Sequence, residues 1–220
     1  MTPDRKNLVS ILASRIESVR KPHPVRVAVD GRTASGKTTL ADEVAAELRA
    51  RGRAVIRTSV DGFHRPRAER YRRGRLSAEG YLDDARDWSA VRKLLLDPLG
   101  PEGDLLYRTA SFDLDRDEPI EQTTQRADPN AILVVDGTFL QRPELADAWD
   151  LIVFVDASEA VATRRGIARD AASLGGEDRA REAHERRYQA AFALYEVRVG
   201  PMRRAHVVVS NDDVDVPCIA

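Results

Sequence analysis

Eight consecutive residues, 31–38, combine glycine, lysine and hydroxyl side chains at a spacing suited to binding phosphate. They read G-R-T-A-S-G-K-T and fit the pattern G-x-x-x-x-G-K-[S/T]. Glycine at both ends lets the backbone curve around an anion, which the loop N–H groups and the following helix N-terminus attract. In this phosphate-binding loop, Lys37 would reach the β- and γ-phosphates, and Thr38 would offer its hydroxyl to Mg²⁺. The pattern predicts a site for ATP and Mg²⁺ formed by Gly31, Arg32, Thr33, Ala34, Ser35, Gly36, Lys37, Thr38 and Thr39.

Lysine is scarce in this chain, which adds weight to the lysine of the loop. Of 35 basic residues, only Lys6, Lys21, Lys37 and Lys93 are lysines. The alternative interpretation, an ordinary turn between a strand and a helix that happens to contain Lys37, is therefore disfavoured.

Aspartates follow several apolar runs of the sequence. Asp136 comes directly after the run 132–135, where an acid that binds Mg²⁺ is expected, and Asp156 is its rival after the run 151–155. Asp61 follows the run 54–58, at the strand end where ligands bind in an open α/β sheet. An aspartate there can orient an attacking hydroxyl and accept its proton. Because Asp136 and Asp61 each precede glycine, the alternative for both is a turn residue.

Arginines supply the positive charge that phosphoryl transfer requires. Arg164, Arg165 and Arg169 lie in a predicted helix before Gly175-Gly176, which indicates a mobile lid over about 164–182. The alternative is a solvated helix face, with charges paired to nearby acids. A denser cluster of six arginines between 65 and 75 either surrounds an anionic substrate or coats a surface, and the sequence leaves both open.

The elements that would position these residues alternate along the chain. Apolar runs predict buried strands over 25–29, 54–58, 132–135, 151–155 and 207–209. Apolar stripes with helical spacing lie between them, which indicates an α/β fold: a doubly wound, mainly parallel five-stranded sheet with helices on both faces. We expect one domain over 1–220, with the lid and a covering segment over about 62–86.

Composition limits the possible partners. The chain has 220 residues, a net charge of −1 and 42% hydrophobic residues, which favours a folded protein over a disordered one or a dedicated nucleic-acid binder. No apolar run could cross a bilayer, and no targeting signal is visible. Its single cysteine, Cys218, cannot form an internal disulfide. We expect a cytoplasmic protein with a small-molecule acceptor and no nucleic-acid or membrane partner; a homo-oligomer remains open.

Taken together, these motifs resemble the uridine kinase branch of the P-loop kinases, a group that also contains phosphoribulokinase and bacterial pantothenate kinase. The resemblance covers most of the chain, from Val25 to Asp212. The motif S-x-D-x-F-[Y/H] of uridine kinases is matched by 59–64. It implies that Asp61 is the catalytic base and that His64 contacts the nucleoside. The acid-glycine pair at a strand end is matched by Asp136-Gly137.

Two further motifs of the family are matched less closely. The P-x-Y-D segment reads Ala110-Ser111-Phe112-Asp113 here, and keeps only the aspartate that would bind ribose. The lid pattern R-R-x-x-R-D is matched by 164–170 with one extra residue, which turns the paired arginines by about 100° of helix. The resemblance implies Arg169 at the transferred phosphoryl group, Arg165 at the nucleotide, and Arg164 at the acceptor.

The leading hypothesis is a kinase that phosphorylates a hydroxyl of a small molecule, with a nucleoside such as uridine as the first candidate. The covering segment begins directly after Asp61, so we expect His64 and Tyr71 to contact the acceptor. Residues 79–87 also resemble pantothenate kinases, so pantothenate and sugars stay as alternatives. An inactive ATP-binding regulatory module is a further alternative. A GTP-binding switch is disfavoured, because the motif N-K-x-D is absent and 211–213 lacks its lysine.

Overall fold

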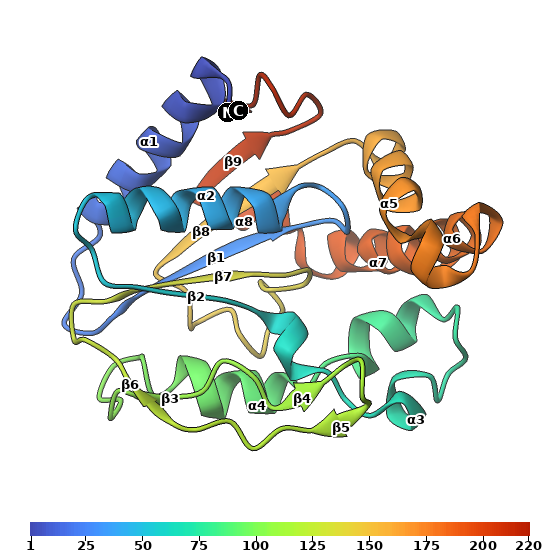
Figure 1. Cartoon of the computed structure of the whole chain (residues 1–220), viewed down its shortest axis with the longest axis horizontal. Helices are drawn as coiled ribbons and strands as arrows, with labels where there is room; N and C mark the ends of the chain where they lie inside the picture. The colour runs from blue at the N-terminus through green and yellow to red at the C-terminus, as the bar shows by residue number, and fades with distance from the viewer.

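A six-stranded sheet forms the centre of the molecule in a computed structural model that describes all 220 residues (Figure 1). Its order is β10-β9-β8-β1-β7-β2. The strands are β1 (Val25–Gly31), β2 (Val55–Ser59), β7 (Ile132–Asp136), β8 (Leu151–Asp156), β9 (Val207–Ser210) and β10 (Cys218–Ile219). The first five are parallel, which confirms the predicted fold class. The number five was too low, because β10 adds an antiparallel edge strand that is too short to show an apolar pattern.

Helices cover both faces of the sheet. On one face, α1 (Pro3–Ser18) and α2 (Lys37–Ala50) pack against the strands through side chains such as Leu12 and Leu48. On the other face lie α4 (Trp88–Val91), its continuation η3 (Arg92–Leu96) and α7 (Ala190–Val199). Because every residue of β1 is buried, apolar side chains are required on both of its faces, as its sequence indicated.

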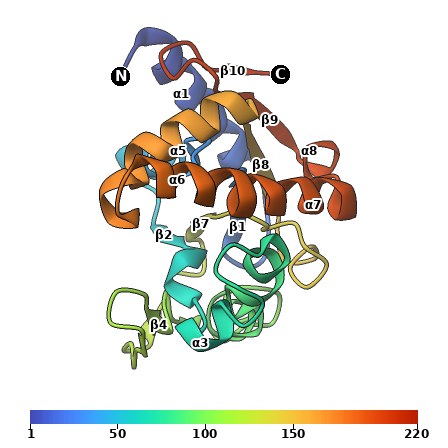
Figure 2. The same cartoon turned by 90° about the vertical axis from the view of Figure 1, so that its right-hand side faces the viewer.

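Shorter elements build the rim of the molecule. After β2 come η1 (Val60–Phe63), α3 (Arg67–Arg70) and η2 (Gly80–Asp84). Two small sheets pair β3 (Leu106–Tyr107) with β6 (Gln125–Arg126), and β4 (Phe112–Asp113) with β5 (Glu118–Pro119). The C-terminal part contains α5 (Glu159–Leu174), α6 (Glu177–Ala183), η4 (His184–Gln189) and α8 (Pro201–Arg204), and α5, α6 and α7 lie along one side of the molecule (Figure 2).

The covering segment is more than a surface excursion. Phe63, Tyr81, Leu82 and Ala85 of this segment belong to the larger hydrophobic core. In the lid, α5 ends at Gly175, whose φ of +85° is a left-handed conformation that favours glycine. The covering segment is therefore anchored in the core, beyond the carboxyl end of β2.

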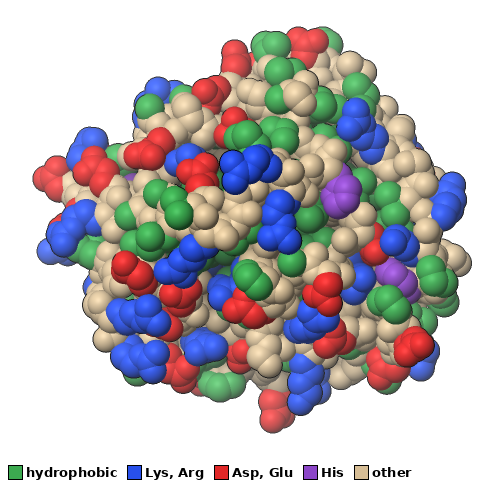
Figure 3. Space-filling model, turned by 180° about the vertical axis from the view of Figure 1, so that it is seen from behind, with side chains coloured by type: hydrophobic (Ala, Val, Ile, Leu, Met, Phe, Trp, Pro, Cys, Tyr) green, Lys and Arg blue, Asp and Glu red, His purple; other side chains and the backbone are tan.

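Positive and negative side chains are interspersed on the face drawn in Figure 3, in keeping with the net charge of −1. None of the helices is both long enough and apolar enough to cross a membrane.

A buried aspartate joins three parts of the fold. Asp30 lies at the end of β1, is 0% exposed, and accepts hydrogen bonds from the backbone N–H groups of Gly31 and Phe139 (2.8 and 3.1 Å). It also accepts from Gln141 Nε2 (3.1 Å) and from the Tyr195 hydroxyl (2.7 Å). The phosphate-binding loop, the segment after β7 and α7 thus share one carboxylate. All four partners are donors, which favours the charged carboxylate, but burial outweighs them and raises the pKa of Asp30.

The variant Tyr195→Phe tests this connection. It removes one donor from buried Asp30 and leaves the Gln141 N–H, now bonded to the Tyr195 hydroxyl at 2.8 Å, without an acceptor. We expect a loss of about 1–3 kcal/mol in the free energy of unfolding, measured in urea. Tyr107→Phe is the matched control, because its hydroxyl bonds only to Gln125 in a part-buried position, and it should cost less than about 1 kcal/mol. Equal urea midpoints for Tyr195→Phe and the wild type would refute a structural role for the connection.

Candidate active site

A cleft of about 310 Å³ lies between the phosphate-binding loop, the covering segment and the lid. Strand register explains its position, because Val29 of β1 and Ser59 of β2 both pair with Asp136 at the carboxyl end of β7. Of the residues that the sequence singled out, the cleft is lined by Thr33, Ala34, Lys37, Thr38, Asp61, His64, Tyr71, Asp136 and Arg169. A larger hollow of about 860 Å³ lies against α5 and α6 and contains none of the loop residues.

The phosphate-binding loop depends on its two glycines. A Cβ on Gly31 would lie 2.4 Å from the Val155 carbonyl oxygen, and one on Gly36, where φ is +97°, would lie 2.4 Å from Asn211 Nδ2. Lys37 Nζ donates to the Arg32 carbonyl oxygen at 2.7 Å and has no carboxylate within 4 Å. Burial lowers the pKa of Lys37, and the more distant Asp136 counteracts this only in part. An anion bound in the loop would compensate the buried charge of this lysine.

A buried carboxylate lies next to a hydroxyl where a metal ion is expected. Thr38 Oγ1 donates to Asp136 Oδ2 at 2.6 Å, and the Asp136 side chain is 4% exposed. Arg57 Nη2 lies 2.8 Å from Asp136 Oδ1, but that oxygen accepts no well-aligned hydrogen bond. A hard oxygen donor with a free lone pair beside a hydroxyl fits Mg²⁺, which takes one or two carboxylates together with substrate phosphates. Its rival Asp156 does not line the cleft.

Asp61 is paired with an arginine that the sequence analysis did not identify. Arg86 is 3% exposed, and its Nη2 and Nε donate to Asp61 Oδ1 at 2.7 and 3.3 Å. Desolvation acts to raise the pKa of Asp61, but the neighbouring groups, Arg86 first among them, together outweigh it and hold this pKa below its usual value. The carboxylate therefore stays charged at neutral pH, while 61% of its side chain remains accessible from the cleft.

His64 is a neutral neighbour of this pair. Its Nδ1 donates to the Asp61 carbonyl oxygen at 2.8 Å, which leaves Nε2 as an acceptor. Burial, followed by the nearby Arg86 charge, lowers the pKa of His64 to about 4. An uncharged imidazole can contact a polar group of a ligand without adding charge.

The lid brings one of its three arginines to the cleft. Arg169 donates to Asp170 at 2.7 and 3.0 Å, and Asp170 also bonds to fully buried His184 at 2.8 Å. Desolvation acts to raise the pKa of Asp170, but His184 and Arg169 together lower it by more, so this pKa lies below its usual value. Arg165 instead donates to the carbonyl oxygens of residues 211 and 212, and Arg164 lines the hollow against α5 and α6.

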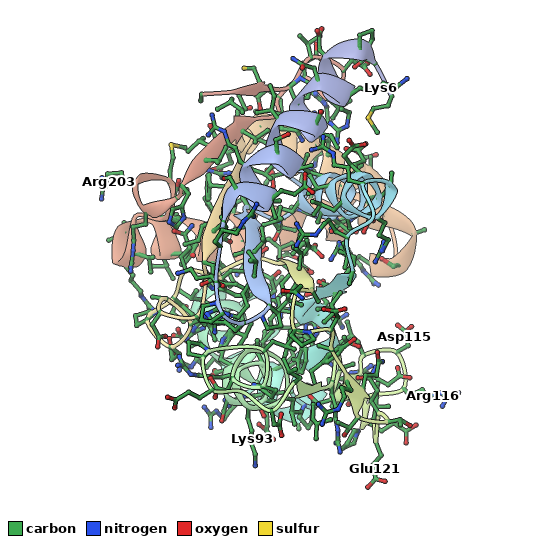
Figure 4. All side chains as sticks on the ribbon, turned by 90° about the vertical axis from the view of Figure 1, so that its left-hand side faces the viewer. Lys6, Lys93, Asp115, Arg116, Glu121 and Arg203 are labelled. Carbon is green, nitrogen blue, oxygen red and sulfur yellow. The ribbon has the colours of Figure 1, made fainter.

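Other predicted residues also lie outside the cleft. Arg32 bonds to Gln189 at 2.9 Å and stacks on Phe192, so it connects the loop to α7. Asp113 accepts two backbone N–H groups within its hairpin, whose labelled residues Asp115 and Arg116 project into solvent (Figure 4). Its neighbour Leu114 does line the cleft. Of the remaining loop residues, Ser35 is fully buried and Thr39 is exposed on α2.

Among the cleft residues to which the sequence assigned no individual role are Arg70, Tyr81, Arg86 and Arg187. Tyr81 and Arg86 lie within the stretch 79–87, which was noted only for its resemblance to pantothenate kinases. In a chain with so many arginines, no spacing distinguishes Arg86 and Arg187 from surface residues.

Comparisons with known proteins show the family and the fold of this chain. A model of the phosphoribulokinase/uridine kinase family matches residues 26–215. Uridine-cytidine kinase B of Dictyostelium discoideum is 32% identical over 153 residues, which are 70% of this chain but only 61% of that protein. A solved structure described as a possible uridine kinase from Bacillus stearothermophilus has a TM-score of 0.72 and 24% identity, covering 92% of this chain and 97% of that one. D-glycerate 3-kinase from Cryptococcus neoformans has a TM-score of 0.54 and 13% identity, covering 84% and 86%.

The lowered pKa of His64 predicts how stability depends on pH. In the unfolded chain this histidine takes up a proton near pH 6.5, but in the folded protein only near pH 4. The contribution of neutral His64 to the free energy of unfolding is therefore fully present above pH 6.5. It is lost as the pH falls towards 4, by at most about 3 kcal/mol. Urea unfolding at pH 7, 5.5 and 4.5 should show a smaller acid loss for His64→Gln than for the wild type. The same loss in both proteins would refute a buried neutral His64.

Proposed function

The chain belongs to the phosphoribulokinase/uridine kinase family, and from this premise we propose that it transfers the γ-phosphoryl group of ATP to a hydroxyl of a small molecule. One observation carries the proposal: Lys37 of the phosphate-binding loop and the accessible carboxylate of Asp61 line the same cleft. The first can bind the phosphate that is transferred, and the second can bind the hydroxyl that receives it.

On the donor side, the loop N–H groups and Lys37 would bind the β- and γ-phosphates of ATP. Thr38 and Asp136 would hold a magnesium ion, which offsets phosphate charge when bound. Arg169 can approach the γ-phosphoryl oxygens from the lid, once its bond with Asp170 is exchanged for one with phosphate.

On the acceptor side, Asp61 would accept a hydrogen bond from the acceptor hydroxyl and orient its oxygen towards the γ-phosphorus. A bond forms between that oxygen and phosphorus, the bond from phosphorus to the oxygen bridging the β- and γ-phosphates breaks, and ADP leaves. The hydroxyl proton passes to the Asp61 carboxylate. Because the pKa of Asp61 is lowered by Arg86, this transfer is expected late in the reaction, when the hydroxyl has become acidic.

Two classes of acceptor are candidates. A nucleoside such as uridine or cytidine is supported by the name of the 32% identical relative and by the place of His64 and Tyr71 in the cleft. The position of Asp113 outside the cleft gives no support for a ribose contact there. A small hydroxy acid or sugar derivative is the second class, and the arginines of the cleft favour it.

The variant Asp61→Asn tests the proposed chemistry. It keeps the size of the side chain but removes the basic oxygen and the charge, so kcat should fall by roughly 10²- to 10⁴-fold with ATP affinity little changed. ADP release with Mg-ATP across a panel of nucleosides, pantothenate and sugars provides the assay.

Asp156→Asn is the matched control, because this aspartate ends strand β8 of the same sheet but does not line the cleft, so the variant should retain wild-type kcat. If Asp61→Asn weakened Mg-ATP binding with kcat intact, Asp61 would act at the metal and the proposed base would be wrong. If the wild type released no ADP with any acceptor in the panel, that result would favour the inactive regulatory module.

A further inference from the structure

The cleft contains more buried positive charge than the donor side uses. Of the six arginines between 65 and 75, only Arg70 is buried, at 6% exposure, and it lines the cleft. Arg187 of η4 reaches the same cleft from the lid side at 7% exposure. Together with Arg86, three buried guanidinium groups face one small volume.

Aromatic rings hold these groups in place. The Arg187 guanidinium lies 4.8 Å from the centre of the Tyr71 ring and 5.0 Å from that of Tyr81. Arg70 lies 5.5 Å from the Tyr71 ring, and Arg86 lies 5.3 Å from the Tyr81 ring. A continuous row of contacts therefore runs from Arg86, beside Asp61, through Tyr81 to Arg187 and on to Arg70.

The three arginines differ in whether a carboxylate pairs with their charge. Arg70 pairs with Asp117, and Arg86 pairs with Asp61, both at 2.7 Å. Arg187 has no carboxylate within 4 Å, and its one hydrogen bond goes to the Arg75 carbonyl oxygen at 3.1 Å. A buried nitrogen of each group has no partner: Nε of Arg70, Nη1 of Arg86 and Nε of Arg187. Burying an unpaired charge is costly, so an anion that binds Arg187 would gain strongly from it.

Neighbouring groups respond to the same positive field. Burial acts to raise the pKa of Tyr71, but Arg187 and then Arg70 outweigh it and lower that pKa. Burial also acts to raise the pKa of Tyr81, but Arg86 and the hydrogen bond with Thr33 together lower it.

These arginines belong to the acceptor side of the cleft. Arg187 and Arg70 contact the covering segment, through Arg75 and Tyr71, and the hairpin residue Asp117. Neither forms a hydrogen bond or an ion pair with the phosphate-binding loop. A phosphate in that loop would bind to Lys37 and the loop N–H groups instead.

We propose that the acceptor is a small hydroxy compound with an anionic group, a carboxylate or a phosphate, which binds to Arg187 and Arg70 while its hydroxyl meets Asp61. This inference rests on the proposed function and narrows its acceptor class. A guanidinium matches both kinds of anion with two parallel hydrogen bonds, and a cleft of about 310 Å³ suits a small molecule.

Matched acceptors test the proposal with the wild-type protein. ADP release with Mg-ATP is compared for glycerate and glycerol, for pantothenate and pantothenol, and for ribose 5-phosphate and ribose, with uridine and cytidine as neutral nucleosides. The anionic member of at least one pair should have a kcat/KM about 100-fold or more above its neutral partner and above both nucleosides. The first two pairs test a carboxylate and the third a phosphate. A neutral acceptor used as well as, or better than, every anionic one would overturn the proposal.

A binding measurement tests, independently of turnover, whether an anion binds to Arg187 and Arg70. With the nucleotide site filled by Mg²⁺ and a non-hydrolysable ATP analogue, acetate and methyl phosphate are titrated by calorimetry. At least one should bind the wild type and bind Arg187→Gln about 100-fold more weakly, with Arg70→Gln as the second variant. Arg186→Gln is the control, because Arg186 is exposed and paired with Glu182, and it should bind like the wild type. Absence of binding to the wild type, or equal binding by both cleft variants, would overturn the proposal.

The two proposals fail in different ways. Turnover of neutral acceptors alone would retain the kinase and refute the anionic group. Arginine-dependent binding of an anion, without phosphorylation of any acceptor, would retain the anion site and refute the kinase.

Discussion

The ion pair between Arg86 and Asp61 is the interaction on which the acceptor side of the cleft depends. A guanidinium that is 3% exposed donates to a carboxylate at 2.7 Å and keeps it charged, while most of the carboxylate stays accessible. The same charge lowers the pKa values of His64 and Tyr81. One buried cation thus lowers the pKa values of three groups that face the acceptor, and it does so from the core side of the covering segment.

The donor side depends on a buried carboxylate. Asp30 lies near the end of the central strand β1 and bonds to the backbone where the phosphate-binding loop begins, to the segment after β7, and to α7. Because α7 continues from η4, which carries Arg187, the loop and the lid are built on one connected structure. Sites constructed on the ends of packed strands and helices hold their geometry better than sites on isolated loops. The nucleotide side of the cleft is therefore built on packed elements, whereas the lid tip is a turn at Gly175 and Gly176, both with positive φ.

Short patterns in the sequence predicted the features that depend on neighbouring residues alone, namely the strands and the phosphate-binding loop. The apolar runs located the five parallel strands, and the glycine-lysine spacing located the loop that the structure places beside Asp136 and Asp61. The rest depends on contacts between residues far apart in the chain. Arg86 and Arg187 belong to the site because they are buried against Tyr81. In a chain with so many arginines, the sequence does not distinguish these two from arginines on the surface. Asp30 follows the predicted strand 25–29 with no pattern that distinguishes it, and only the structure shows its bond to Tyr195, 165 residues later. One extra residue of helix changes which side chains of the lid point to the cleft. The packing of α5 decides the outcome: it brings Arg169 to the cleft and leaves Arg164 and Arg165 outside it.

The account thus rests on a carboxylate kept charged by a buried guanidinium at the point where a hydroxyl would meet a phosphate. The most direct test is the pKa of Asp61, measured by ¹³C NMR titration of its carboxyl carbon and assigned by comparison with a protein that lacks this aspartate. In the wild type we expect a pKa below the usual value of about 3.9, and in Arg86→Met a higher pKa than in the wild type, because Arg86 is the first of the groups that lower it. An Asp61 pKa that is the same in both proteins would contradict the account.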